Sequence, residues 1–383
     1  MIPFSLEMPR AVHFGRGALG KLPQTVREIG TRVLVVAGSG WLRASPWATV
    51  ITEGLAGCVV RDLRCPSAEP SVRSVDAAAA EAAEFQPDVL VAVGGGSVLD
   101  TTKALSALVR FRGTAERFLE GLPGAASVPG PGVPWIAVPT TSGTGAEVTK
   151  NAVIKAEAAG VKRSMRSRHL LAHAVLVDPE LTLSLPPGVT GTSGLDAFTQ
   201  LIEAYVSRAS TPPVRSLIEG AFSPMWEALD GLAASPRDIE LRGKASYGAF
   251  ISGVALANAG LGAAHGFAAA VGGMFDVPHG LACAVFLPHV LAANRDVICD
   301  DIARLAGKVS RRGKDAERDP VGWLASEASR LLAVYGLAPD LRGFGIPADT
   351  VTLLAERSSG SSMKGNPREL AMDERTRILS SVL

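Results

Sequence analysis

PDVLVAVGGGSVLDTTK, residues 87–103, passes from a continuous apolar run through three glycines into a helical pattern. An apolar run without polar alternation is typical of a strand buried on both faces, as in a parallel sheet. We therefore expect a strand over 87–93 and a helix over 98–110.

The same pattern recurs around this segment. Short β-rich runs occupy 32–37, 59–63 and 135–138, and an Ala-rich helical stretch occupies 72–85. Strands that alternate with helices in this way predict an α/β domain built on a parallel sheet. The Pro- and Gly-rich segment 123–134 is expected to be a loop.

The sequence pattern changes near Leu185-Pro186-Pro187. After this point strand-like runs are scarce and Ala/Leu-rich helical patterns dominate. The sequence therefore predicts an α/β domain over 1–185 and an all-helical domain over 186–383. We expect the functional site in the cleft between them.

The glycines of the first segment suit a phosphate. Gly95 and Gly96 let the backbone approach a ligand closely, and the following helix start presents free N–H groups to an anion. Ser97 can cap the helix and donate to a phosphate, and Asp100 can accept from a ribose or a carboxamide. An ordinary strand-to-helix turn with a Ser cap is the alternative, and the loop is not the GxGxxG fingerprint.

A second polar loop, PTTSGTGAEVT at 139–149, follows the strand expected over 135–138. Thr140, Thr141 and Thr144 offer small donors and acceptors. A solvated loop is the alternative, but together with the glycine loop it favours a nucleotide groove.

Two of the six histidines, His265 and His279, lie in the Gly- and Ala-rich segment GAAHGFAAAVGGMFDVPHG at 262–280. Upstream, Asp196 and Gln200 are four residues apart and share one helical face. A carboxylate and two imidazoles suit a borderline ion such as Zn²⁺ or Fe²⁺. The alternative is two structural histidines and a helix-capping aspartate.

Composition limits the partners. The chain has 383 residues, 47% of them apolar, and 38 basic against 37 acidic side chains give a net charge of +1. That balance argues against nucleic acid or a membrane surface as the main partner. No membrane span or signal peptide is expected, and the four cysteines (Cys58, Cys65, Cys283, Cys299) suggest free thiols in the cytoplasm.

Taken together, these motifs resemble the iron-containing (group III) alcohol dehydrogenase family. The matching blocks are 94–103, 139–149, 177–187 with 194–207, and 262–280, and the likeness covers nearly the whole chain. It implies the dehydroquinate synthase-like architecture: an α/β dinucleotide-binding domain followed by an all-α metal-binding domain. It also implies NAD(P)H, a divalent metal, hydride exchange between nicotinamide and an alcohol or aldehyde, and a homodimer or larger homo-oligomer.

The resemblance also assigns residues. It implies Gly95, Gly96 and Ser97 at the pyrophosphate, and Asp100, Thr140, Thr141, Thr144, Thr149, Asn151 and Lys162 along the rest of the cofactor. It implies Asp196, Gln200, His265 and His279 at the metal, with Asp196, His265 and His279 as the catalytic set.

Three positions depart from the family pattern. Gln200 stands where many members have a third histidine, so it could ligate weakly, leave an open three-ligand site, or accompany loss of the metal. Ala269 replaces another frequent histidine and leaves the proton source open. Gly38 replaces an aspartate common in NAD-preferring members, which permits NADPH, with Arg43 within possible reach of the phosphate.

The sequence thus predicts a metal-dependent, NAD(P)H-linked reductase that interconverts a small aldehyde or ketone and an alcohol. The alternatives are a metal-independent reductase resembling maleylacetate reductase, a dehydroquinate synthase-like lyase, and a non-catalytic nucleotide-binding protein. A basic cluster at Arg163, Arg166 and Arg168 could receive an acidic substrate, although a solvated surface is the simpler interpretation.

Overall fold

The computed structural model describes residues 3–38, 45–66, 69–309 and 314–383. The chain divides into two compact units. The first comprises Glu7–Thr141 and Gly145–Thr182, and the second comprises Leu183–Leu383 together with Ser142–Thr144 and the N-terminal residues up to Leu6. The short segment Ser142–Thr144 therefore belongs to the helical unit, although it lies within the sequence of the first.

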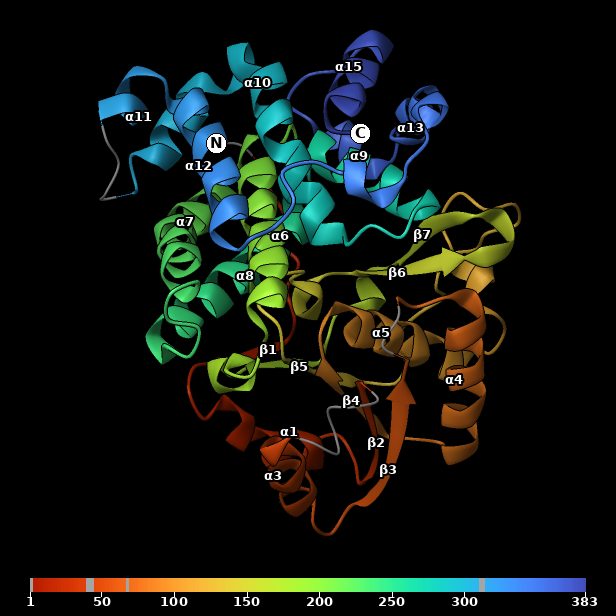
Figure 1. Ribbon diagram of the computed structural model, residues 1–383. Coiled ribbons are helices and arrows are strands. Elements are labelled where there is room, and N and C mark those ends of the chain that lie inside the picture. The colour runs from red at the N-terminus through yellow and green to blue at the C-terminus, as the bar shows by residue number, and fades with distance from the viewer. Residues whose placement is uncertain (1–2, 39–44, 67–68, 310–313) are drawn as a thin grey trace. The chain divides into compact units, whose positions relative to one another are not determined.

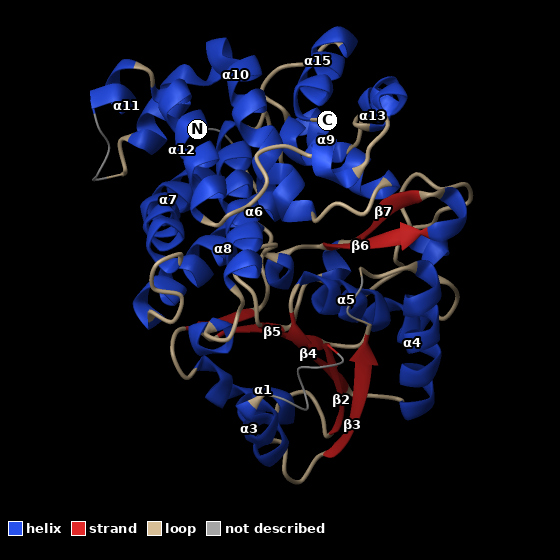
Figure 2. Ribbon diagram, viewed as in Figure 1, coloured by secondary structure: helices blue, strands red, loops and turns tan. Residues whose placement is uncertain are grey.

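The first unit is built on a six-stranded sheet (Figures 1 and 2). All its strand pairs are parallel, as the sequence predicted, and the strand order is β1-β8-β5-β4-β2-β3. The strands are β1 (Ala11–Phe14), β2 (Arg32–Gly38), β3 (Val59–Cys65), β4 (Val89–Gly94), β5 (Trp135–Pro139) and β8 (Ala174–Val177). The central strands are wholly buried because their apolar runs face a helical layer on each side.

The strand order creates a topological switch point in the sheet. Strand β2 pairs with β3 on one side and β4 on the other, so the chain reverses direction across the sheet between β2 and β4. Ligands of open α/β sheets bind outside the carboxyl ends of the strands at such a switch point. Gly38 ends β2 there, and Gly94 ends β4 beside Pro139 of β5.

The helices of this unit are α1 (Leu22–Arg27), α3 (Pro46–Gly54), α4 (Val72–Phe85) and α5 (Gly96–Phe111). Helix α4 has the bounds the sequence predicted, because Ser71 and Ser74 form a reciprocal capping box at its start. An antiparallel hairpin, β6 (Asn151–Ala156) with β7 (Val161–Arg166), was not predicted.

The second unit is helical, as predicted. Its helices are α6 (Pro187–Val206), α7 (Pro212–Leu232), α8 (Ile239–Ala259), α9 (Ala263–Met274), α10 (His279–Ala306), α11 (Lys314–Arg318), α12 (Pro320–Val334), α13 (Val351–Arg357), α14 (Ser361–Gly365) and α15 (Met372–Val382). Helix α6 is buried along its entire C-terminal half. It packs against α7, α8 and α10, so a polar side chain on α6 must find its partners inside the unit.

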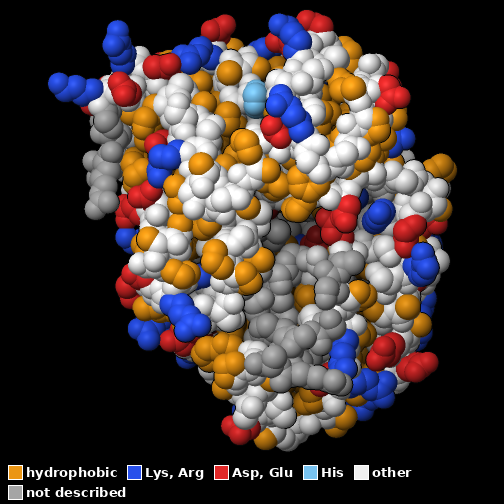
Figure 3. Space-filling model, in the orientation of Figure 1, with side chains coloured by type: hydrophobic (Ala, Val, Ile, Leu, Met, Phe, Trp, Pro, Cys, Tyr) orange, Lys and Arg blue, Asp and Glu red, His pale blue; other side chains and the backbone are white. Residues whose placement is uncertain are grey.

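Helix α10 is long and apolar enough to span a membrane by composition, with a mean hydropathy of 1.4 over its most apolar window. However, 61% of that window is buried inside the protein, where α6, α9 and α12 pack against the helix. Such burial is typical of a core helix. On the face shown in Figure 3, basic and acidic side chains are interspersed.

Candidate functional site

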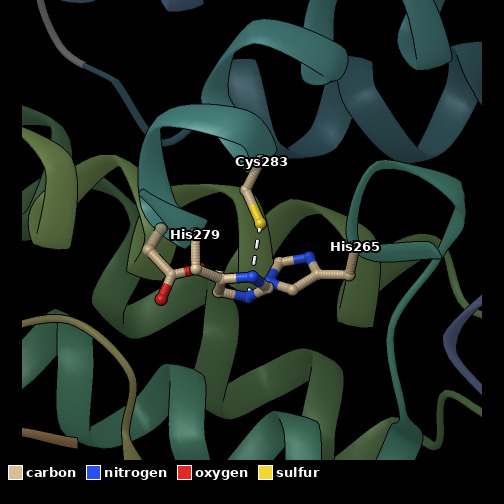
Figure 4. A group of neighbouring side chains, drawn as sticks. His265, His279 and Cys283 are labelled. Atoms are coloured by element: carbon tan, nitrogen blue, oxygen red, sulfur yellow. Dashed lines mark hydrogen bonds and ion pairs between the residues drawn. The ribbon is translucent and has the colours of Figure 1, made fainter. Parts of the chain in front are cut away.

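Four side chains of the helical unit converge on one point. One ligand atom each from Asp196, His265, His279 and Cys283 lies within 4.8 Å of all the others. Asp196, His265 and Cys283 are buried, and His279 is partly exposed. Figure 4 shows the two imidazole rings side by side with the Cys283 sulfur directed at them. The sequence predicted the first three of these residues as ligands but not the cysteine.

Three helices bring these residues together. Asp196 lies midway along α6, His265 lies in the first turn of α9, and His279 begins α10. Gly280 permits the approach of α10 to α6, because a Cβ on it would lie 2.2 Å from the Thr192 carbonyl oxygen. The absence of a side chain at this glycine thus sets the separation between Asp196 and His279.

The distances suit a metal ion. His265 Nε2 lies 3.1 Å from Asp196 Oδ1, and His279 Nε2 lies 3.6 Å from Cys283 Sγ. A tetrahedral ion with bonds of about 2.0–2.3 Å separates its ligand atoms by about 3.3–3.8 Å. These residues therefore fit a divalent ion with little rearrangement.

Glu203 fixes the orientation of one of these rings. Its Oε2 lies 2.6 Å from His265 Nδ1, and its Oε1 accepts a hydrogen bond from the Ala264 backbone N–H at 2.6 Å. With Nδ1 donating to this carboxylate, Nε2 carries the free lone pair that a metal requires. The sequence prediction missed Glu203, although it lies on the Asp196 face of α6, two turns further on.

Gln200 has partners of its own. Its Oε1 accepts a hydrogen bond from Ser252 Oγ at 2.7 Å, and its Nε2 donates to the Thr144 carbonyl at 3.4 Å. The amide therefore joins α6 to α8 and to the Ser142–Thr144 segment. A metal-ligand role for Gln200 remains a prediction.

The cluster favours positive charge. Burial acts to lower the pKa of His265, but Cys283, Asp196 and Glu203 outweigh it and raise that pKa well above its usual value. Interaction with Cys283 raises the pKa of His279, although desolvation acts in the opposite direction. Burial acts to raise the pKa of Asp196, but the His265 hydrogen bond and the His279 charge more than offset it and lower that pKa. Such a site stabilises a cation, whether protons or a metal ion.

The glycine loop of the first unit lies at the carboxyl end of β4. Gly95 precedes α5 as its N-cap residue and makes no side-chain cap, while its carbonyl accepts from the N–H groups of Val98 and Leu99. The N–H groups of Gly96 and Ser97, which start the helix, are therefore the ones available to an anion. A Cβ on Gly95 would lie 3.2 Å from the Thr141 side chain, so the two predicted loops pack together. The predicted capping role of Ser97 is wrong, because Ser97 lies inside the first turn.

A buried lysine links the next predicted residues. Lys103 Nζ donates to Asp100 Oδ1 at 2.9 Å, to Thr149 Oγ1 at 2.7 Å and to the Asn151 carbonyl at 2.8 Å. The other oxygen of Asp100 accepts from the Val153 N–H at 2.9 Å, at the β6–β7 hairpin. Asp100, Thr149 and Asn151 are thus brought together, and the sequence prediction missed the lysine that holds them.

The remaining predicted cofactor residues are more dispersed. Thr140 is buried, and its N–H donates to the Gly94 carbonyl. Lys162 forms an ion pair with Glu69. Thr144 belongs to the helical unit. Arg43, named for a possible phosphate contact, lies outside the described residues.

Comparison with known proteins decides the family. The family model for iron-containing alcohol dehydrogenase matches residues 9–179, and the model for the C-terminal part of the Fe-containing alcohol dehydrogenase family matches residues 190–383. The chain belongs to the iron-containing alcohol dehydrogenase family. The predicted family and the predicted class of enzyme, an alcohol dehydrogenase or aldehyde reductase, are confirmed.

Individual members of this family match along their length. Long-chain-alcohol dehydrogenase 1 of Geobacillus thermodenitrificans is 31% identical over 91% of this chain and 88% of that protein. The NADPH-dependent butanol dehydrogenase of Clostridium saccharobutylicum is 30% identical over 100% of this chain and 98% of that protein. The crystal structure of a 1,3-propanediol oxidoreductase superposes with a TM-score of 0.90 at 26% identity, covering 100% of both chains.

Proposed function

We propose that this alcohol dehydrogenase family member is a metal-dependent, NAD(P)H-linked reductase that interconverts a small aldehyde or ketone and the corresponding alcohol. The observation that carries the proposal is the convergence of Asp196, His265 and His279 on one buried point. The names of relatives, which include an alcohol dehydrogenase and a butanol dehydrogenase, support the same reaction class.

Each residue of the proposed metal site has a separate role. When bound, the metal ion supplies Lewis-acid chemistry toward a carbonyl oxygen, and the dinucleotide supplies the hydride. Asp196 contributes the negative charge that retains a cation in a buried site. His265 and His279 fix the geometry, with His265 held by Glu203. Partial exposure of His279 leaves the cluster accessible to a small molecule.

The cofactor residues form the other half of the proposal. The free N–H groups at the start of α5, flanked by Gly95, Gly96 and Ser97, would bind the pyrophosphate. Asp100, Thr140, Thr141, Thr144, Thr149, Asn151 and Lys162 would line the rest of the cofactor, and Gly38 would face its ribose. We further propose a cytoplasmic homo-oligomer.

Replacement of His279 by Ala tests this function. We expect loss of the bound metal and a fall in turnover of about 100-fold or more, because transition-state charge loses its stabilisation. Nucleotide affinity, measured by fluorescence titration, should stay unchanged. His289→Ala is the matched control, since His289 lies on the same helix but contacts Ser381.

The opposite results separate the alternatives. Unchanged turnover in His279→Ala would favour the metal-independent reductase. A product formed without net consumption of NAD(P)H would favour the lyase.

A further inference from the structure

We propose that the Cys283 thiolate is a fourth protein ligand of the metal, and that this sulfur makes the site selective for zinc. The inference rests on the proposed metal-dependent function and concerns the composition of that same site. It assigns a role to a residue that the sequence suggested only as a free thiol.

The position of Cys283 is the first argument. His279 and Cys283 lie one turn apart on the same face of α10, and their Nε2 and Sγ atoms are separated by 3.6 Å (Figure 4). The cysteine is 0% exposed. Because both side chains project from one rigid helix, this edge of a tetrahedron is already formed.

The second argument is the position of Gln200. A ligand one turn after Asp196 on α6 would provide a fourth donor, but the amide there is held by Ser252 and by the Thr144 carbonyl. Cys283 supplies from α10 the donor that this position does not supply from α6. The ligand set then becomes one carboxylate, two imidazoles and one thiolate.

The third argument is charge and softness. Asp196 and a Cys283 thiolate together carry the two negative charges that balance a divalent ion, and the thiol proton leaves to solvent on binding. Soft sulfur donors favour zinc over harder ions that prefer oxygen ligands. A substrate oxygen would enter as a fifth ligand on the partly exposed side near His279.

The test compares three proteins with the wild type after loading with Zn²⁺ or Co²⁺. Cys283→Ala removes the sulfur. Cys299→Ala is the control, because this exposed cysteine lies on the same helix. Cys283→Ala combined with Gln200→His returns a fourth donor from α6. X-ray absorption of the zinc form and the near-ultraviolet spectrum of the cobalt form report the ligands directly.

We expect one sulfur neighbour at about 2.3 Å from zinc in the wild type and in Cys299→Ala, with a thiolate-to-cobalt charge-transfer band. Cys283→Ala should lose both signals and bind zinc about 10-fold or more weakly. The double variant should regain affinity without the sulfur signals.

Metal bound in the wild type by nitrogen and oxygen alone would overturn this inference and leave the proposed function intact. Sulfur signals that persist in Cys283→Ala would also overturn it. A wild type that binds no metal yet turns over would overturn both proposals.

Discussion

Glu203 holds Nδ1 of His265 at 2.6 Å, and this contact determines that Nε2 is the nitrogen facing Asp196. The two residues are 62 positions apart, and both are nearly inaccessible to solvent. A carboxylate behind a ligating imidazole fixes its tautomer and raises its basicity. The ring is therefore oriented by the protein itself, as the proposed metal site requires.

Replacement of Glu203 by Gln should weaken metal binding by about 10- to 100-fold, because the amide lacks the negative charge and, with its NH2 group facing Nδ1, would place the ring proton on Nε2. Competition with a chromophoric chelator measures the affinity. Glu219→Gln is the control, since Glu219 pairs with Tyr205 and Lys308 instead. Equal affinities for the two variants would contradict the role of Glu203.

Gly280→Ala should separate α10 from α6. The added Cβ would lie 2.2 Å from the Thr192 carbonyl oxygen, so we expect destabilisation of about 1–3 kcal/mol together with weaker metal retention. Gly243→Ala is the matched helical control, because no atom lies within 4 Å of its Cβ position. Denaturant unfolding and metal content, measured on both variants, check the expectation. Gly280→Ala with full stability and full metal content would show that the close approach is not required.

Glu147 should make the sheet unit less stable as pH rises. Burial raises the pKa of Glu147 from 4.5 to about 7, against the smaller opposing effects of its own backbone N–H and Lys103. The folded state therefore retains a proton that the unfolded state loses between these two values. The associated stability is complete below pH 4.5 and is lost as pH rises through about 7.

Glu147→Gln removes this dependence. The difference in free energy of unfolding between the variant and wild type should rise in favour of the variant by about 3 kcal/mol from pH 4 to pH 8. Glu157→Gln provides a comparison of opposite sign, because a hydrogen bond from Ser71 lowers the pKa of Glu157. Parallel pH profiles for wild type and Glu147→Gln would refute the prediction.

Gly38→Asp should shift cofactor preference toward NADH. A carboxylate at the end of β2 would bind the ribose hydroxyls and repel a 2′-phosphate. We expect kcat/KM with NADPH to fall by about 10- to 100-fold relative to that with NADH. Gly38→Asn has a similar volume without the charge, so an equal shift in that variant would argue against an electrostatic cause.

The apolar strands were predictable because burial on both faces leaves a continuous hydrophobic signal. The segments around β2, β4 and β5 were found in this way. Strand β3 lies at the edge of the sheet and is mostly exposed, so it was found from its short β-rich run alone. Strands β1 and β8 were not predicted, because a strand of four residues is too short to show a clear hydrophobic pattern. The β6–β7 hairpin was not predicted, because polar residues at its exposed positions interrupt the apolar pattern of both strands.

The residues of the candidate site were likewise predictable only in part. Asp196, His265 and His279 stood out as polar residues in apolar surroundings. Cys283 did not, because a cysteine in an apolar helix is an ordinary core residue, and only the folded chain shows what its sulfur faces. Its spacing of four from His279 was the available signal. Glu203 likewise needed the three-dimensional pairing of α6 with α9.

Metal content and turnover followed together during chelation test the central claim most directly. We expect one divalent ion per chain, loss of NAD(P)H-linked aldehyde reduction in proportion to metal removed, and recovery on addition of Zn²⁺. Full turnover by protein that elemental analysis shows to be metal-free would contradict it.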